Sequence, residues 1–234
     1  MLLEKPIAET LSEAESLAPF VRANSSNLMI GHIVLFNSEF RQLRDEAARR
    51  DGICYIDCVR HRPASIVMDF HGENPLQATM VHDLYAVQVL LDRAEPSHFN
   101  AQFHRTAARA VDLALAQLQW SDGTLASFAA SYMTPAGMAP RGFDRMEVFG
   151  RGWAARTSPN PRPVEIWDDQ KATWPMALEI RADPAGPTGM MAEELRSYCR
   201  VVRGLDSVLV GATYPDAIQV QRWMDRLCAA AESS

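Results

Sequence analysis

The chain has 234 residues, of which 47% are hydrophobic, and it carries a formal net charge of −6 at pH 7. This hydrophobic content predicts a sizeable buried core and argues against long disorder. The charges are spread along the chain, which argues against nucleic acid as a partner because phosphate binding needs clustered Lys and Arg, and no run reaches the ~20 apolar residues of a membrane helix.

The start of the chain lacks the basic and then apolar segments of a secretory signal peptide, so we expect a soluble, cytoplasmic protein. The four cysteines include no Cys-x-x-Cys pair. Cys54 and Cys58 lie four residues apart in a predicted strand, and no His or Cys cluster follows them at zinc spacing. We therefore predict reduced thiols on one face of that strand and no metal site.

The first 37 residues have the pattern of a strand, a helix and a second strand. An apolar run over residues 1–6 ends at Pro6, which cannot continue a strand ladder. Thr10 with Glu13 three residues later predicts a capping box at the start of a helix. Residues 28–32 form a continuous apolar run, which is typical of a buried strand. This order predicts a small parallel βαβ unit.

The remaining elements predict a second, larger sheet. Residues 38–50 and 77–91 have apolar side chains at helical spacing, whereas residues 53–59 alternate as in a half-buried strand. Residues 60–76 carry many polar groups and are predicted to be irregular. From residue 99 to about 168, short alternating segments separated by turn residues predict an antiparallel meander.

Within that meander, residues 107–118 are ambiguous because their Ala and Leu content suits a strand or a helix. Two helices, over residues 191–204 and 214–231, end the chain. The predicted fold class is α+β: a broad, mostly antiparallel sheet with helices on one face, preceded by the βαβ unit.

Four segments of the chain occur in the order and spacing of one enzyme family. They are Leu-Leu-Glu-Lys-Pro-Ile-Ala at 2–8, Gly-His-Ile-Val-Leu-Phe-Asn-Ser at 31–38, Ala-Thr-Met-Val-His-Asp-Leu at 78–84, and Arg-Met-Glu-Val-Phe-Gly at 145–150. Together they resemble the Gfo/Idh/MocA oxidoreductases over nearly the whole chain. That family joins an N-terminal Rossmann domain, which binds NAD or NADP, to a C-terminal open sheet that supplies the substrate wall and the oligomer interface.

The resemblance implies a domain division and a set of site residues. Residues 1–37 would be a remnant of the Rossmann-type βαβ unit and residues 38–234 the C-terminal α/β domain. In the family's reaction a hydride leaves a sugar carbon while a base takes the hydroxyl proton. Lys5 matches the catalytic lysine, and His82 matches the catalytic histidine that can act as the base. By the same resemblance, cofactor contacts come from Glu4, Lys5 and Pro6. We predict substrate contacts from His32, Asn37, Arg60 and Asp83.

The sequence departs from the family pattern beside His82. The aspartate expected one helical turn earlier is Ala78, which removes a carboxylate from the face that positions i and i+4 share. Asp83 points about 100° away around the helix and is a poor replacement. Leu35 stands at the family's arginine and Ser38 at its proline.

A dinucleotide site needs a Gly-rich turn between a strand and a helix. The one match, at residues 150–155, precedes a segment that cannot open a helix, so we interpret it as a turn. NAD or NADP is therefore implied by resemblance only, and we do not expect this chain to bind it alone. Three hypotheses stay open: a catalytic part completed by a separate Rossmann subunit, a non-catalytic binding or oligomerisation module, and a fragment of a full-length enzyme.

Two further groups of side chains have more than one interpretation. A polar group suits either the phosphate or carboxylate of a nucleotide sugar or a solvated loop: Arg60, His61, Arg62, His71 and Glu73. An aromatic group suits sugar stacking or core packing: Trp153, Trp167 and Trp174. Under each hypothesis we expect a homo-oligomer, such as a homodimer, formed through the sheet face, because a large apolar face is rarely left in water. The expected small-molecule ligand is a sugar, an inositol or a nucleotide sugar.

Overall fold

The structure, a computed structural model, describes residues 1–68, 73–138, 142–160, 166–167, 170, 172–173 and 186–233. Its N-terminal part is a two-stranded parallel sheet of β1 (Leu2–Glu4) and β2 (Met29–Gly31), with α1 (Leu11–Ser16) between them in sequence. The predicted capping box of α1 is confirmed, because the Thr10 and Glu13 side chains each accept a hydrogen bond from the other's backbone N–H. The predicted parallel βαβ arrangement is therefore confirmed.

The main sheet has six strands in the order β4-β5-β6-β3-β7-β8. Neighbouring strands are antiparallel except β3 and β6, which are parallel. The ambiguous segment 107–118 contributes a strand, β5. The strands are β3 (Ile53–Pro63), β4 (His98–Arg105), β5 (Val111–Gln119), β6 (Leu125–Thr134), β7 (Phe143–Gly150) and β8 (Trp153–Asn160). A separate antiparallel pair is formed by β9 (Ile166–Trp167) and β10 (Ala172–Thr173).

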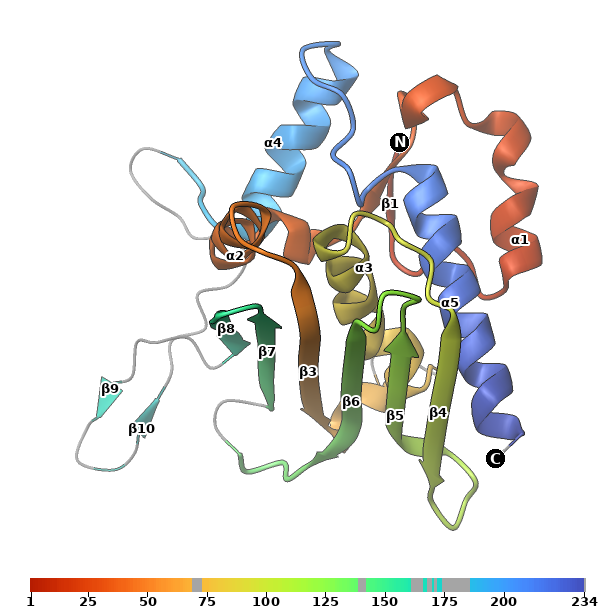
Figure 1. Ribbon diagram of the computed structural model, residues 1–234, viewed down its shortest axis with the longest axis vertical. Coiled ribbons are helices and arrows are strands. Elements are labelled where there is room, and N and C mark those ends of the chain that lie inside the picture. The colour runs from red at the N-terminus through yellow and green to blue at the C-terminus, as the bar shows by residue number, and fades with distance from the viewer. Residues whose placement is uncertain are drawn as a thin grey trace.

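The helices lie on one face of the main sheet and at its upper edge (Figure 1). The longest, α5 (Tyr214–Glu232), packs against β4 and also contacts α3 (Val81–Leu90) and α1. Trp223 of α5 is fully buried and meets Trp120 edge to face, with ring centroids 6.2 Å apart. Through Ile218 and its neighbours α5 also joins the apolar cluster beneath β1 and β2, so it connects the small parallel sheet to the main one.

The other helical elements are shorter than α5. The α-helices are α2 (Ser38–Ala48) and α4 (Met190–Val202). The short elements are η1 (Ala18–Phe20), η2 (Ala23–Ser25), η3 (Ile33–Phe36), η4 (Ala64–Met68) and the π-helical η5 (Leu76–Met80). Within the described ranges, no helix has the length and apolarity needed to cross a membrane.

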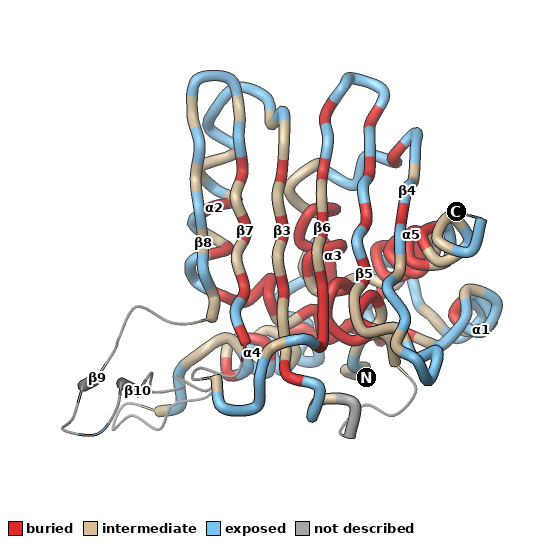
Figure 2. Tube along the Cα trace, turned by 90° about the horizontal axis from the view of Figure 1, so that it is seen from below, coloured by how far each residue is buried: buried red, intermediate tan, exposed pale blue. Residues whose placement is uncertain are grey.

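The second face of the main sheet carries no helix in the described part of the chain. Along the strands, buried residues alternate with intermediate or exposed ones, as expected for a sheet packed on one side (Figure 2). The strand register places Leu115, Leu125, Phe143 and Phe149 on this open face, and each is more than a third exposed. The expected α+β sheet with helices on one face is thus confirmed.

Three local predictions need correction. Strand β3 continues through Arg60 to Pro63, so residues 60–63 are not irregular; pairing with β6 on one side and β7 on the other extends the strand. Cys54 is exposed whereas Cys58 is buried, because the β3–β7 register shifts between Ile53 and Tyr55 and the two thiols no longer share a face. The helix predicted over 77–91 begins as the π-helical η5. His71, Trp174 and the Trp167 side chain lie outside the described residues.

Candidate active site

The parallel pairing of β1 and β2 places two candidate residues at one edge. Glu4 registers against Gly31, so Lys5 and His32, which follow them, leave the sheet side by side. The Lys5–Pro6 peptide bond is cis. In open α/β sheets, ligands bind outside the carboxyl ends of parallel strands, which is where these two residues lie.

Lys5 reaches from this edge to the beginning of the helix that carries His82. Its Nζ donates a hydrogen bond to the backbone carbonyl of Ala78 at 2.6 Å. Burial is the main cause that lowers the pKa of Lys5 below its ordinary value; Arg60 adds to this effect, while Glu73 and Glu4 oppose it. A larger fraction of Lys5 is therefore neutral, and able to accept a proton, than for a solvated lysine.

His82 lies on α3, one turn beyond Ala78. Its Nδ1 is 2.7 Å from the hydroxyl oxygen of Tyr85, and the two rings meet edge to face. Burial, followed by the positive charge of Lys5 and then of Arg60, holds the pKa of His82 well below its usual range. His82 is therefore neutral at pH 7.

Tyr85 also supports His32 on its other side. The two rings stack, with centroids 4.0 Å apart and an interplanar angle of 8°. The Nδ1 of His32 donates to the carbonyl of Gly211 at 2.5 Å, and burial lowers the pKa of His32 to about 4. Gly211 has φ +92°, and a Cβ there would stand 2.3 Å from Val89 Cγ2, so only glycine fits beside this histidine.

Arg60 and Asp83 form a buried ion pair beneath the same helix. The Arg60 guanidinium donates to both Asp83 carboxylate oxygens, at 3.1 and 2.7 Å, and to Asp144 at 3.1 Å. Arg62 also binds Asp144. Arg60 is 7% exposed and Asp83 is 3% exposed. The opposite charges of Arg60 and Asp83 compensate each other, and their ion pair links α3 to β3. The predicted contacts of both residues with a substrate stay predictions.

Asn37 and Glu4 contribute in different ways. The Asn37 side chain caps α2 by accepting a hydrogen bond from the Phe40 N–H at 2.9 Å, so its oxygen already has a structural partner. Glu4 is exposed and lies against Gly31, where a Cβ would meet its carboxylate at 3.0 Å. Its contact with a cofactor, and the contact of Asn37 with a substrate, stay predictions.

Sequence reasoning missed two buried polar residues, Tyr85 in this cluster and Glu194 on α4. Tyr85 is three positions after His82, a spacing at which side chains meet on a helix. Glu194 lies on α4 and is 2% exposed, with one carboxylate oxygen buried and unpartnered within the described structure. It shares a helix face with Val201, seven residues later, and that spacing was the available signal. Burial, and to a smaller extent the charge of Glu4, raise the pKa of Glu194 to about 7.

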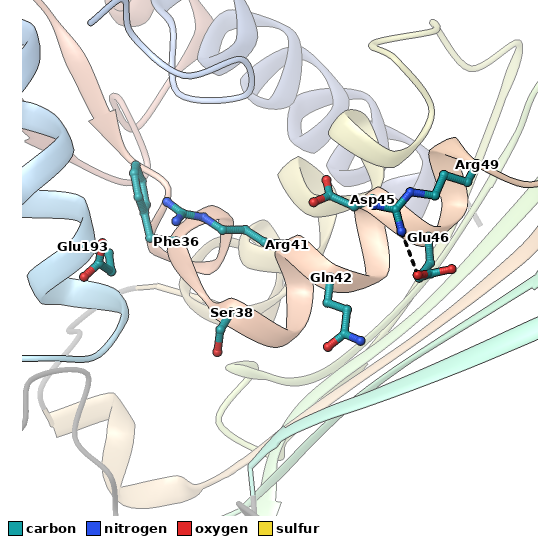
Figure 3. Close-up of a pocket in the computed structure, with 8 residues that line it drawn as sticks. All are labelled: Phe36, Ser38, Arg41, Gln42, Asp45, Glu46, Arg49 and Glu193. Carbon is teal, nitrogen blue, oxygen red and sulfur yellow. Dashed lines mark hydrogen bonds and ion pairs between the residues drawn. The ribbon is translucent and has the colours of Figure 1, made fainter. Parts of the chain in front are cut away.

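A separate open groove of about 610 Å³ follows α2 (Figure 3). Its lining residues are Phe36, Ser38, Arg41, Gln42, Asp45, Glu46, Arg49 and Glu193. Figure 3 shows Glu193 of α4 facing this groove from the side of Phe36. Neither Lys5 nor His82 lines it, so it is distinct from the cluster described above.

Comparisons with known proteins agree with this fold. A family model for the GFO/IDH/MocA C-terminal domain matches residues 25–154. No curated protein matches the sequence. Among solved structures, a UDP-N-acetylglucosamine 3-dehydrogenase from Acidithiobacillus ferrooxidans is 21% identical with a TM-score of 0.74, and covers 99% of this chain and 70% of its own.

Two inositol dehydrogenases give similar values. The scyllo-inositol dehydrogenase from Lactobacillus casei, solved with NAD(H) and scyllo-inositol, is 18% identical with a TM-score of 0.74, over 99% of this chain and 70% of its own. A putative myo-inositol dehydrogenase from Sinorhizobium meliloti 1021 is 18% identical with a TM-score of 0.75, over 99% and 71%. At these identities the likeness concerns the fold.

Proposed function

This chain belongs to the Gfo/Idh/MocA family, and from that membership we propose that it is the substrate-binding and proton-transferring part of an NAD(P)-linked oxidoreductase acting on a sugar, an inositol or a nucleotide sugar. The observation that carries the proposal is the meeting of Lys5, from the end of β1, with the start of the helix that bears His82. The similar structures named above are dehydrogenases of inositols and of a UDP-sugar.

The described residues that suit a dinucleotide lie at its reacting end. Lys5 and His82 form a polar, partly buried cluster at the carboxyl edge of parallel strands, which suits the reacting end. A pyrophosphate needs free N–H groups at a helix N-terminus. At α1 two of these N–H groups, those of Thr10 and Glu13, are occupied by the capping box. The one Gly-rich match, at residues 150–155, joins β7 to β8 and opens no helix. We therefore assign the phosphate-binding element to another unit, whether a separate Rossmann subunit or a longer form of this polypeptide.

The proposed chemistry uses the two bases in this cluster. NAD(P), when bound, supplies the hydride acceptor. Neutral Lys5 takes the hydroxyl proton of the substrate as its carbinol carbon loses hydride. The hydrogen bond from Nζ to the Ala78 carbonyl positions the lysine nitrogen for this transfer. Neutral His82 orients the reacting oxygen.

A second candidate function is a non-catalytic binding or oligomerisation module. The lack of a carboxylate at position 78 favours this function, because Ala78 has no side-chain group that could assist a proton transfer. Its backbone carbonyl instead accepts a hydrogen bond from Lys5. Under this hypothesis the same cluster binds a polyol without oxidising it.

Ligand binding tests both candidates. We would titrate the purified chain with scyllo-inositol, myo-inositol and UDP-N-acetylglucosamine by calorimetry, comparing wild type with Lys5→Met, His82→Asn and the control Gln42→Ala, which alters only the groove along α2. Binding that Lys5→Met and His82→Asn weaken at least about tenfold, but Gln42→Ala does not, supports the proposal. Polyol binding that neither site variant affects contradicts it.

A second titration, with NADH and NADPH followed by fluorescence, tests the assignment of the cofactor unit. Binding by the chain alone would overturn that assignment. Binding only with a co-purifying Rossmann protein supports the oxidoreductase. Polyol binding with no nicotinamide binding in any combination favours the non-catalytic module.

A further inference from the structure

The Tyr85 hydroxyl lies between the backbone N–H of Val34, which can only donate a hydrogen bond, and His82 Nδ1, which can donate or accept one. The backbone N–H of Val34 donates to Tyr85 Oη at 3.2 Å. On the other side, His82 Nδ1 is 2.7 Å from the same oxygen. The Tyr85 side chain is fully buried, and burial raises its pKa above the ordinary value, so the phenol keeps its proton.

The positions of these atoms determine where the protons lie. A phenol has one proton to donate, and Val34, a backbone N–H, cannot accept it. His82 Nδ1 is the only other partner of Tyr85 Oη in the described part of the chain. If Nδ1 carried a proton and donated it, the Tyr85 hydroxyl proton would be buried without an acceptor, which is costly. Nδ1 must therefore accept.

We propose that Tyr85 is a positioning residue that fixes neutral His82 as the tautomer protonated on Nε2. His82 thus presents a hydrogen-bond donor, not a lone pair, to a ligand in the site. Within the described residues, Nε2 of His82 has no hydrogen-bond partner, so this proton remains available. The part of the inference that concerns catalysis rests on the proposed function: His82 donates to the substrate oxygen, and Lys5 is the base.

The chemistry of the group that faces Nδ1 of a histidine decides whether its Nε2 donates or accepts a hydrogen bond. A carboxylate beside a histidine can only accept, so it holds the proton on the nearer nitrogen and leaves the farther one as a base. Position 78, one turn before His82, has no carboxylate. Tyr85, three positions after His82, supplies a donor instead. Stacking of His32 at 4.0 Å fixes the Tyr85 ring and so the direction of its hydroxyl.

Nitrogen NMR of the chain with ¹⁵N-labelled histidine tests the proposal without cofactor or substrate. Long-range ¹H–¹⁵N correlations show which ring nitrogen carries the proton. We expect His82 to be protonated on Nε2 with an excess of at least about tenfold over the other tautomer, equivalent to about 1.4 kcal/mol. His32 is an internal reference, because its Nδ1 faces the Gly211 carbonyl and must show the opposite tautomer. The His82→Asn variant identifies the His82 signal.

Tyr85→Phe provides the second measurement, because phenylalanine cannot donate to Nδ1. We expect the variant to contain both tautomers, while the control Tyr55→Phe, which removes a hydroxyl bonded to Ser127 on the open sheet face, leaves His82 unchanged. A wild-type His82 protonated on Nδ1, or a folded Tyr85→Phe protein with an unaltered spectrum, overturns the proposal. If Tyr85→Phe does not fold, the wild-type spectrum alone decides. Failure to bind polyols would contradict the proposed function and leave this result intact.

Discussion

Lys5 and Ala78 are 73 residues apart in sequence, yet the lysine Nζ donates to the alanine carbonyl at 2.6 Å. This contact joins the end of β1 to η5, the turn that begins the helix bearing His82. The contact holds the Lys5 side chain in a position where burial and the positive charge of Arg60 lower the pKa of the lysine.

Lys5 should lose its proton at a lower pH than an ordinary lysine. Lys171 is the only other lysine in the sequence, so a ¹H–¹³C spectrum of the lysine side chains contains two resolvable signals, and Lys5→Met identifies one. We expect the Lys5 signal to titrate below the unperturbed value of about 10.4. Titration at or above that value would contradict the role of Lys5 as the proton acceptor.

Asp83→Asn should destabilise the fold strongly, because it leaves the Arg60 charge buried with only Asp144 as a partner. Removing one member of a buried pair costs about 3–5 kcal/mol. Urea unfolding of the variant measures this loss. The control Asp45→Asn breaks an exposed pair with Arg44 and should change stability little. A stable Asp83→Asn protein with weakened polyol binding would instead favour the predicted substrate contact.

Glu194 should make stability depend on pH. Its folded-state pKa of about 7 lies above its ordinary value, so the native state holds the proton more tightly than the unfolded state between these values. The stabilisation from this proton is complete below pH ~4.5 and is lost as pH rises through about 7. Glu194→Gln should therefore unfold like wild type at pH 5 and be more stable at pH 8, by roughly 1–3 kcal/mol.

Urea titrations at both pH values measure this difference. Glu193→Gln is the matched control, because the neighbouring carboxylate is exposed and paired with Arg196. An equal effect of Glu194→Gln at pH 5 and pH 8 would argue against a raised pKa.

Gly211→Ala should destabilise the support of His32. The new Cβ would stand 2.3 Å from Val89 Cγ2 and 2.8 Å from a Leu35 methyl group, at φ +92°. Gly123→Ala separates the two causes, since Gly123 has φ +90° but nothing within 4 Å of its Cβ. We expect about 1 kcal/mol for the control, from backbone strain alone, and about 2–4 kcal/mol for Gly211→Ala. If Gly211→Ala and Gly123→Ala lose the same stability in thermal unfolding, the predicted clash of the new Cβ at position 211 is wrong.

The open face of the main sheet should form a homodimer. Leu115 and Leu125 are 41% and 45% exposed on this face. Placing a charge in such an interface removes apolar burial and leaves the charge unpaired, so Leu115→Glu should shift the protein towards monomer in light scattering. The control Val202→Glu alters a valine on α4 that is 63% exposed, and it should leave the mass unchanged. A monomeric wild-type protein would contradict this prediction.

Local patterns were sufficient to predict most elements of this fold. The capping box of Thr10 and Glu13, the apolar run of β2 and the long final helix depend on residues that are neighbours in the chain, and each is confirmed. The order and spacing of the four segments at 2–8, 31–38, 78–84 and 145–150 were sufficient to indicate the family, which the family match confirms. These features survive in sequence because capping and periodicity act over a few residues.

Only the tertiary structure decided what the polar residues do. The sequence contains no sign that Arg60 would pair with Asp83, or that Lys5 would donate to the backbone carbonyl of Ala78. Tyr85 receives a hydrogen bond from Val34 because η3 lies against α3, and Glu194 is buried on α4, which packs against η3. Burial makes each polar group find a partner or change its pKa, and burial is set by contacts between segments far apart in the chain.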